Sequence, residues 1–124
     1  MEELTIDKTK FTPRIVTNSG IIEIYGVSMP ERASEFYEPV LKWVEDYMDE
    51  GGDVKFILKF YYLNSASVHC IKNIIEKANL MGDIEVDWYY ESDDEGIEMT
   101  GRFISQSIDV EFNMIESKET YKGF

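Results

Sequence analysis

The sequence has few basic residues for its acidic content. Lysine and arginine together number 12 against 25 aspartates and glutamates, which gives the 124 residues a formal net charge of −13. Proteins that wrap nucleic acid or dock on anionic membranes derive much of their affinity from Lys and Arg. The composition therefore argues against nucleic acid and membrane as partners, and it favours a protein partner with a neutral or basic face.

Cysteine is almost absent, since Cys70 is the only one. A lone cysteine forms no intrachain disulfide and assembles no cysteine-based zinc site. The N-terminal residues lack the apolar core of a signal peptide, and no run approaches the roughly 18 apolar residues that a membrane-spanning helix needs. We therefore expect a cytoplasmic protein without a membrane segment.

Apolar material is plentiful enough for one folded domain. Hydrophobic residues make up 44% of the chain and aromatic residues 14%, so a sizeable core is available. No repeat, low-complexity tract or linker-like break divides the sequence. We predict a single domain over residues 1–124.

Hydrophobic periodicity predicts that strands and helices alternate. Short β-branched or alternating segments predict strands at residues 14–16, 21–25, 54–62, 84–90 and 108–114. Apolar residues at helical spacing predict helices over residues 31–50, from the 63–67 turn to Gly82, and more weakly over 95–104. This order predicts an α/β fold in which helices pack on a mixed β-sheet of about four to five strands.

Three of these elements carry more specific expectations. The apolar segment 54–62 predicts a strand that is buried on both faces. Pro39 predicts that the first helix has a bent start or begins near Pro39, with Ser28 or Ser34 as its cap. The alternation of apolar and polar residues over 108–114 predicts a strand with one face in water.

Residues suited to catalysis are sparse. His69, the only histidine, adjoins Cys70, but neighbours on a helix point about 100° apart and form no natural pair. We expect an exposed His69 and a half-buried Cys70. No nucleophile elbow, phosphate-binding loop or dinucleotide motif is present. The sequence therefore points to no catalytic residue, metal site or cofactor, and an enzyme that depends on carboxylates is the least supported alternative.

An acidic stretch, residues 85–99, contains no lysine or arginine. Residues 91–96 are faintly similar to a calcium-binding loop, but Arg102 occupies the position of the closing glutamate. We expect a solvated acidic loop, which also offers a docking surface to a basic partner.

Ser65 is the most informative position. It follows a predicted strand and lies where the second helix should begin. Asn64, Ser65 and Ser67 are all good helix caps, so one interpretation of Ser65 is structural. The other is a phosphorylation site, because a helix N-terminus presents N–H groups and a positive dipole end to a phosphate. The two interpretations are compatible, and the residues leave both open.

Several segments together resemble the SiaC-type family of bacterial regulatory phosphoproteins. The resemblance rests on Gly26-Val27-Ser28-Met29-Pro30-Glu31, on Phe36-Tyr37-Glu38-Pro39-Val40-Leu41-Lys42-Trp43 and on Tyr62-Leu63-Asn64-Ser65-Ala66-Ser67, and Thr12-Pro13 also fits. It extends over most of the chain, and the Tyr-Leu-Asn-Ser turn is its most specific element. The resemblance implies a fold like that of the STAS domains of anti-sigma factor antagonists.

The resemblance also implies a function. In such proteins a Ser/Thr protein kinase phosphorylates the strand–helix junction and a PP2C-like phosphatase reverses the reaction. The unmodified form binds and activates a diguanylate cyclase, which connects the switch to cyclic-di-GMP and biofilm control. Asn64-Ser65 stands at the junction here. The family's phosphate acceptor is usually threonine within Leu-Asn-Thr-Ser-Ser, whereas this chain has Ser65, Ala66 and Ser67 at those last three positions. Ser65 keeps a hydroxyl group there, and Ser67 is an alternative acceptor.

We therefore expect a non-enzymatic regulatory phosphoprotein that acts as a partner switch. Ser65 is its predicted phosphorylation site, and Asn64, Tyr61 and Tyr62 are predicted to shape the partner-binding surface. The alternatives are a constitutive protein-interaction domain, in which Ser65 is only a helix cap, and a domain that binds a small ligand at the strand ends.

Overall fold

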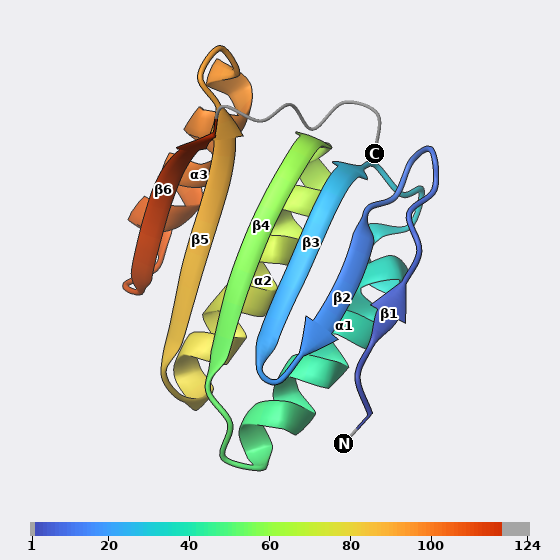
Figure 1. Ribbon diagram of the computed structural model, residues 1–124, viewed down its shortest axis with the longest axis vertical. Coiled ribbons are helices and arrows are strands. Elements are labelled where there is room, and N and C mark those ends of the chain that lie inside the picture. The colour runs from blue at the N-terminus through green and yellow to red at the C-terminus, as the bar shows by residue number, and fades with distance from the viewer. Residues whose placement is uncertain (1, 118–124) are drawn as a thin grey trace.

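The computed structural model describes residues 2–117, which form one six-stranded sheet and three helices (Figure 1). The elements in chain order are β1 (Thr5–Ile6), β2 (Arg14–Asn18), β3 (Ile21–Ser28), α1 (Ala33–Asp49), β4 (Val54–Leu63), α2 (Ser65–Met81), β5 (Ile84–Glu91), α3 (Glu95–Ser107) and β6 (Glu111–Ser117). The strands lie in the sheet in this same order. β1 to β3 pair antiparallel, and β3 to β6 run parallel.

The predicted α/β fold with helices on a mixed sheet is confirmed, with six strands in place of four to five. The additional strand is the two-residue β1, which is too short to leave a periodic pattern in the sequence. The predicted single domain over residues 1–124 includes residue 1 and residues 118–124, which lie outside the described residues.

All three helices pack on the same face of the sheet, as Figure 1 shows. Each parallel crossover moves one strand further in the same direction, and right-handed crossovers of that kind place their helices on one side. No described helix covers the opposite face, which we call the open face. The prediction that β4 is buried on both faces is therefore wrong: Val54, Phe56, Leu58 and Phe60 are buried towards the helices, whereas the residues between them are only half-buried.

The core lies between the helices and the sheet, and its largest buried side chains come from β4 and β5. Trp88, Phe56 and Phe60 each expose at most 1% of their surface. The Trp88 indole also donates a hydrogen bond from Nε1 to the carbonyl oxygen of Ile97 at 3.0 Å, which ties α3 to the sheet. Burying a side chain of this kind stabilises the fold by about 1.5–3 kcal/mol.

α1 begins at Ala33, which confirms the helix predicted over residues 31–50, and of the two alternatives for its start the one near Pro39 is wrong. The N-cap is Arg32, whose side chain makes no capping hydrogen bond, and neither Ser28 nor Ser34 takes that place. Pro39 lies inside the helix, where it lacks one backbone donor. Burial of one apolar stripe of α1 against the sheet compensates for this loss, and its members are Ala33, Tyr37, Val40, Trp43, Val44 and Met48.

The last helix and strand differ from their predictions in their boundaries. α3 extends to Ser107 and Ile108 closes it, so β6 begins at Glu111 and not at residue 108. Phe112 and Met114 pack against the core, as the alternating pattern predicted. Among the described residues, no helix is both long and apolar enough to cross a membrane.

Candidate functional site

The parallel strands give the sheet two ends, which we call the carboxyl end and the amino end after the strand termini that lie there. At the carboxyl end, Asn64 joins β4 to α2. Its side-chain Oδ1 accepts a hydrogen bond from the Ser67 backbone N–H at 2.9 Å, which caps the helix. Its own N–H donates to the carbonyl oxygen of Ser28 at 3.0 Å. The junction is therefore fixed both to its own helix and to the neighbouring strand β3.

Ser65 is the first residue of α2 and is exposed. Within residues 2–117, its side chain makes no hydrogen bond. The interpretation of Ser65 as the helix cap is wrong, because Asn64 fills that position. The first turn of α2 also contains no acidic residue, so the positive end of the helix dipole is not neutralised there. A negative group on Ser65 would meet a favourable field.

Ser67 lies in a different environment from Ser65, although only one residue separates them. It is fully buried. Its hydroxyl donates to the Ser28 carbonyl oxygen at 3.2 Å and accepts from Ser28 Oγ at 2.8 Å. A kinase active site cannot reach a side chain in this position while the chain is folded. The burial therefore favours Ser65 over Ser67 as the phosphate acceptor.

Exposed apolar side chains surround the Ser65 junction. Tyr61 and Tyr62 at the end of β4 expose 36% and 50% of their surface. They lie at a register shift, where the pairing with β3 passes from Gly26–Phe60 to Val27–Tyr62. Phe11 and Met29 are also exposed, and the Met29 N–H donates to the Phe11 carbonyl oxygen at 2.8 Å. We call Phe11, Met29, Tyr61 and Tyr62 the end patch. Its members come from three adjoining segments, and it suits contact with another protein.

A groove between α1 and α2 leads away from the first turn of α2. Two adjoining hollows, of about 170 and 390 Å³, form it and share Ser34, Cys70 and Asn73 as lining residues. Cys70 is half-buried and His69 is exposed, as predicted. Burial raises the pKa of the Cys70 thiol, which keeps it protonated and unreactive at neutral pH.

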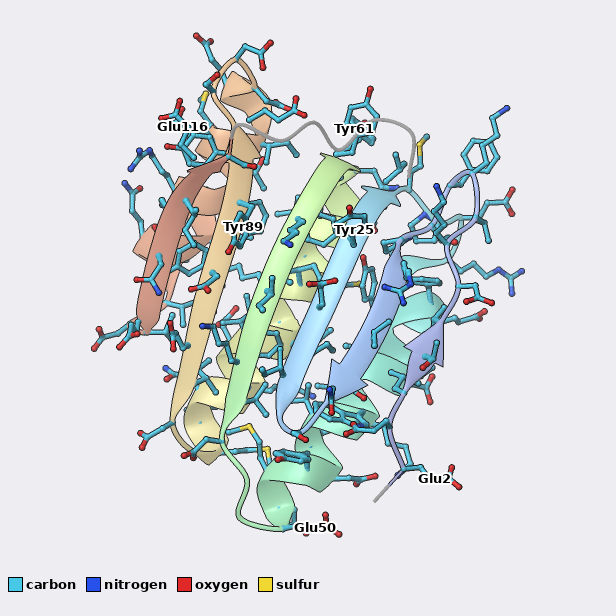
Figure 2. The ribbon with its side chains drawn as sticks, in the orientation of Figure 1. Glu2, Tyr25, Glu50, Tyr61, Tyr89 and Glu116 are labelled. Carbon is cyan, nitrogen blue, oxygen red and sulfur yellow. The ribbon has the colours of Figure 1, made fainter. Side chains whose placement is uncertain are left out.

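On the open face, Lys59 is paired with side chains of the neighbouring strands. Lys59 lies between the rings of Tyr25 and Tyr89, 5.7 and 5.0 Å from their centroids, and pairs with Glu23 at 3.8 Å. Figure 2 shows Tyr25 and Tyr89 on either side of β4, with Tyr61 further along towards the carboxyl end. These contacts leave no uncompensated charge on Lys59 for a ligand.

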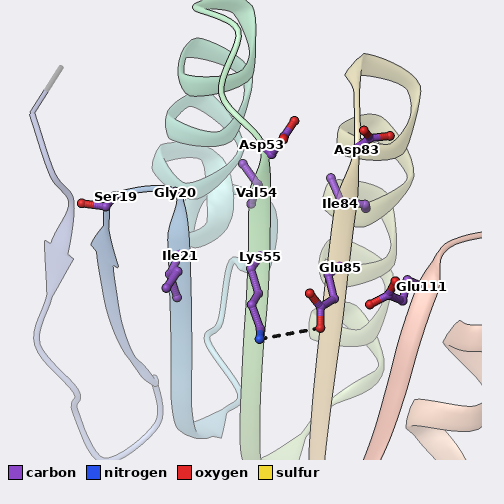
Figure 3. A pocket seen from close by; sticks show the side chains of 10 residues that line it. All are labelled: Ser19, Gly20, Ile21, Asp53, Val54, Lys55, Asp83, Ile84, Glu85 and Glu111. Carbon is purple, nitrogen blue, oxygen red and sulfur yellow. Dashed lines mark ion pairs between the residues drawn. The ribbon is translucent and has the colours of Figure 1, made fainter.

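The amino end holds a hollow of about 380 Å³ with acidic walls (Figure 3). Among the described residues that line it, Lys55 is the only basic one, and its Nζ lies 3.6 Å from Glu85 and 3.2 Å from Asp87. The hydrogen bond and charge of Asp87 raise the pKa of Lys55. Among the described residues, no group of three or more His, Cys, Asp or Glu side chains is arranged to hold a metal ion.

The acidic stretch 85–99 is not the solvated loop that we expected. Its first part belongs to β5 and its last part to α3, with only a short turn between them. Asp87 is buried and accepts from Asn113 Nδ2 at 2.8 Å, Asp94 caps α3, and Glu98 pairs with Arg102 at 2.8 Å. These acids act within the fold, because strand pairing, capping and helical spacing each give them a partner.

Sequence reasoning missed four residues of the carboxyl end. Tyr37 lies in the buried stripe of α1, and its spacing from Ala33 and Val40 was the available signal. Ser28 was named as a cap and as part of the resemblance but not as a site residue, although it ends a strand and is fully buried. Phe11 and Met29 lie in loops without periodicity, so nothing in the sequence alone places them together at the carboxyl end.

Comparison with known proteins gives consistent matches. The model of the SiaC family regulatory phosphoproteins matches residues 6–117. An uncharacterized protein of Pseudomonas aeruginosa is 29% identical over 104 residues, which span 78% of this chain and 82% of that protein. The crystal structure of apo-SiaC from the same species is similar with a TM-score of 0.81 at 25% identity, covering 93% of this chain and 99% of that one.

A further solved structure holds a SiaC protein with its partner. It is described as the diguanylate cyclase SiaD in complex with its activator SiaC from Pseudomonas aeruginosa. The match has a TM-score of 0.84 at 25% identity and covers 92% of this chain and 99% of that one.

Proposed function

The chain belongs to the SiaC family of regulatory phosphoproteins, and from this premise we propose that it is a partner switch, not an enzyme, controlled by phosphate on Ser65. The observation that carries the proposal is the position of Ser65. It is exposed at the first residue of α2, while Asn64 and Ser67 hold the helix start on either side of it. Ser65 is therefore free to be modified without loss of the cap.

A Ser/Thr protein kinase supplies the phosphate in this proposal. Ser65 Oγ attacks the γ-phosphorus of ATP, the bond from that phosphorus to the bridging oxygen breaks, and ADP leaves. The hydroxyl proton passes to a base of the kinase. A PP2C-like phosphatase reverses the state by hydrolysis, which returns the serine and releases inorganic phosphate. The phosphate adds about −1.5 to −2 charge at the positive end of α2, where it is tolerated.

The phosphate acts on binding because of what surrounds it. The end patch and Asn64 form a partly apolar surface, with the Lys10 ammonium 5.7 Å from the centre of the Phe11 ring, and at this surface the unmodified chain binds its output protein. SiaC of Pseudomonas aeruginosa forms a complex with a diguanylate cyclase as its activator, so we propose a diguanylate cyclase as the output protein here. A phosphate brought into such an interface loses hydration without gaining a partner, which weakens binding.

The proposed cell context follows from these partners. A kinase that uses ATP and a cyclase that makes cyclic-di-GMP both place the switch in the cytoplasm, where it connects phosphorylation to biofilm signalling. The chain itself supplies a binding surface and a phosphate acceptor. It provides no catalytic step, so its state and not its turnover carries the signal.

Phosphosite mapping tests the acceptor assignment. The chain is incubated with ATP, phosphatase inhibitors and extract of its native cell, and then analysed by tandem mass spectrometry. We expect phosphate on Ser65, its loss in Ser65→Ala, and its persistence in the matched variant Ser107→Ala. Phosphate on Ser67 in the folded chain would contradict the assignment. An unmodified chain in an extract that phosphorylates other proteins would favour a constitutive interaction domain.

A further inference from the structure

Three buried hydroxyl groups lie beneath the first turn of α2. They belong to Ser28 at the end of β3, Tyr37 on α1 and Ser67 on α2, and we call them the hydroxyl cluster. The exposed fractions are 0%, 2% and 0% in that order. Ser28 Oγ is hydrogen-bonded to both Tyr37 OH and Ser67 Oγ, so it joins the other two groups. Three elements, of which α2 is distant in sequence from the other two, therefore meet at Ser28 Oγ.

The geometry fixes the direction of every hydrogen bond in the cluster. The Ser67 hydroxyl donates its one proton to the Ser28 carbonyl oxygen at 3.2 Å. The Ser28 hydroxyl donates its one proton to Ser67 Oγ at 2.8 Å. Ser28 therefore has no proton left for Tyr37, and Tyr37 must be the donor in the bond between them. Burial raises the pKa of the Tyr37 phenol, so the phenol keeps this proton at neutral pH.

The hydroxyl cluster is hydrogen-bonded to the residues on both sides of Ser65. The Ser28 carbonyl oxygen accepts from the Ser67 hydroxyl and also from the Asn64 N–H at 3.0 Å. Ser65 lies between these two anchored residues. Three hydrogen bonds therefore join the turn to Ser28 on β3, the Asn64 cap on the Ser67 N–H adds one within the turn, and Tyr37 adds the link to α1.

We propose that Tyr37 is a positioning residue for the switch: its hydroxyl, acting through Ser28 and Ser67, fixes the first turn of α2 and so places the Ser65 hydroxyl for phosphoryl transfer. This inference rests on the proposed function. It gives Ser67 a scaffold role, and it predicts that the orientation of Ser65 depends on a side chain that no partner touches. A displaced acceptor oxygen slows transfer, because in-line attack tolerates little misplacement.

The first test is the backbone order of the turn, measured by ¹⁵N relaxation in the full chain. Tyr37→Phe removes only the hydroxyl, and Tyr47→Phe is the matched control on the same helix at the amino end. We expect the amide order parameters of Ser65 to Ser67 to fall from about 0.85 towards 0.6 in Tyr37→Phe and to stay unchanged in the control. Ser28→Ala removes the Oγ that is bonded to both Tyr37 and Ser67, and it should lower the order parameters further. Unchanged values in Tyr37→Phe would overturn the inference.

The second test measures the rate of Ser65 phosphorylation. Native cell extract supplies the kinase, and ATP is added. Tyr37→Phe should lower the limiting rate of Ser65 phosphorylation about tenfold and leave the half-saturating chain concentration within about twofold, because the docking surface is intact. The assay is run at a temperature where wild type and Tyr37→Phe are both fully folded. A lower limiting rate at an unchanged half-saturating concentration then cannot come from a loss of folded protein. Equal rates for Tyr37→Phe and wild type would also overturn the inference.

The two tests separate this inference from the proposal beneath it. If wild-type Ser65 is not phosphorylated, the proposed function fails, and the relaxation measurement still decides whether Tyr37 orders the turn. If Ser65 is phosphorylated equally fast in every variant and the turn stays rigid, the switch stands and the positioning role of Tyr37 is wrong.

Discussion

The two ends of the parallel strands are built from different chemistry. The carboxyl end presents hydroxyls, a capping amide and the exposed rings of the end patch around Ser65. The amino end presents carboxylates around Lys55 and a tight turn at Gly20, where φ is +85°. An added negative charge changes a partly apolar surface far more than it changes an acidic one. This difference supports the proposal that a phosphate signals from the carboxyl end.

The comparison leads to a separation of effects. Changes on the outer surface of the carboxyl end should alter modification and binding while the chain stays folded. Changes at the amino end should alter the free energy of unfolding alone, and changes in the layer beneath Ser65 should alter both. The following predictions test this separation, beginning with the largest expected effect.

The largest effect should distinguish the two serines of the α2 start. Ser67→Asp places a charge in a fully buried site without a cation, so we expect it to lower the free energy of unfolding by about 3–5 kcal/mol. Ser65→Asp, its matched control, adds the same charge at an exposed helix N-terminus and should change stability by less than about 0.5 kcal/mol. Urea unfolding followed by circular dichroism measures both. Equal losses would contradict the claim that only Ser65 tolerates a phosphate.

A smaller loss is expected at the amino-end turn. A Cβ on Gly20 would lie 2.7 Å from the Asp53 carbonyl oxygen, and the positive φ adds strain. We expect Gly20→Ala to destabilise the chain by about 2–3 kcal/mol. Gly51→Ala is the control: its φ of +94° is also positive, but a Cβ there meets no atom within 4 Å. If the two variants unfold at the same urea concentration, the close approach at Gly20 is not what constrains this turn.

Removing a helix cap should cost about 1 kcal/mol at either of two positions. Asn64→Ala removes the acceptor for the Ser67 N–H, and Asp94→Ala removes the equivalent acceptor for the Ile97 N–H on α3. Thermal unfolding should show similar losses for both. Only Asn64→Ala should also slow Ser65 phosphorylation, because only this cap adjoins the acceptor. Equal phosphorylation rates for the two variants would show that the cap has no part in the switch.

The smallest effect concerns the ion pairs of the amino end. The pKa of Lys55 is raised above 10.5, chiefly by Asp87, so its contribution to stability is fully present below that pH and is lost as the pH rises through the folded-state pKa. The free energy of unfolding of Lys55→Gln, measured by urea unfolding across a pH series, should therefore differ most from that of wild type at neutral pH. The difference should shrink in strongly alkaline solution. Lys77→Gln, a change at an exposed lysine of α2, should show no such convergence.

The local features of the switch were predictable from sequence. Asn64 and Ser65 follow an apolar strand and precede a helical pattern, and helix capping depends on residues within one turn. The α/β order followed in the same way from periodicity. The resemblance to a phosphoprotein family then assigned a role to the serine, which periodicity alone does not do.

The layer beneath Ser65 was not predictable. Ser28 meets Ser67 across 39 positions of sequence, and only the parallel pairing of β3 with β4 brings them together. The error on β4 has a similar origin, because its apolar composition does not reveal that every crossover places its helix on the same face. Lys55 and Lys59 within that strand were the signal that one face is open.

The central claim is that phosphate on Ser65 controls binding of the output protein. The most direct measurement is the affinity of a diguanylate cyclase from the source organism for three forms of the chain: unmodified, phosphorylated at Ser65, and phosphorylated at Ser107 as a control at the amino end of the sheet. The account predicts that Ser65 phosphate raises Kd at least about tenfold, which is 1.4 kcal/mol, whereas Ser107 phosphate leaves it within about twofold. Tight binding of the Ser65-phosphorylated chain, equal to that of the unmodified form, would contradict the account.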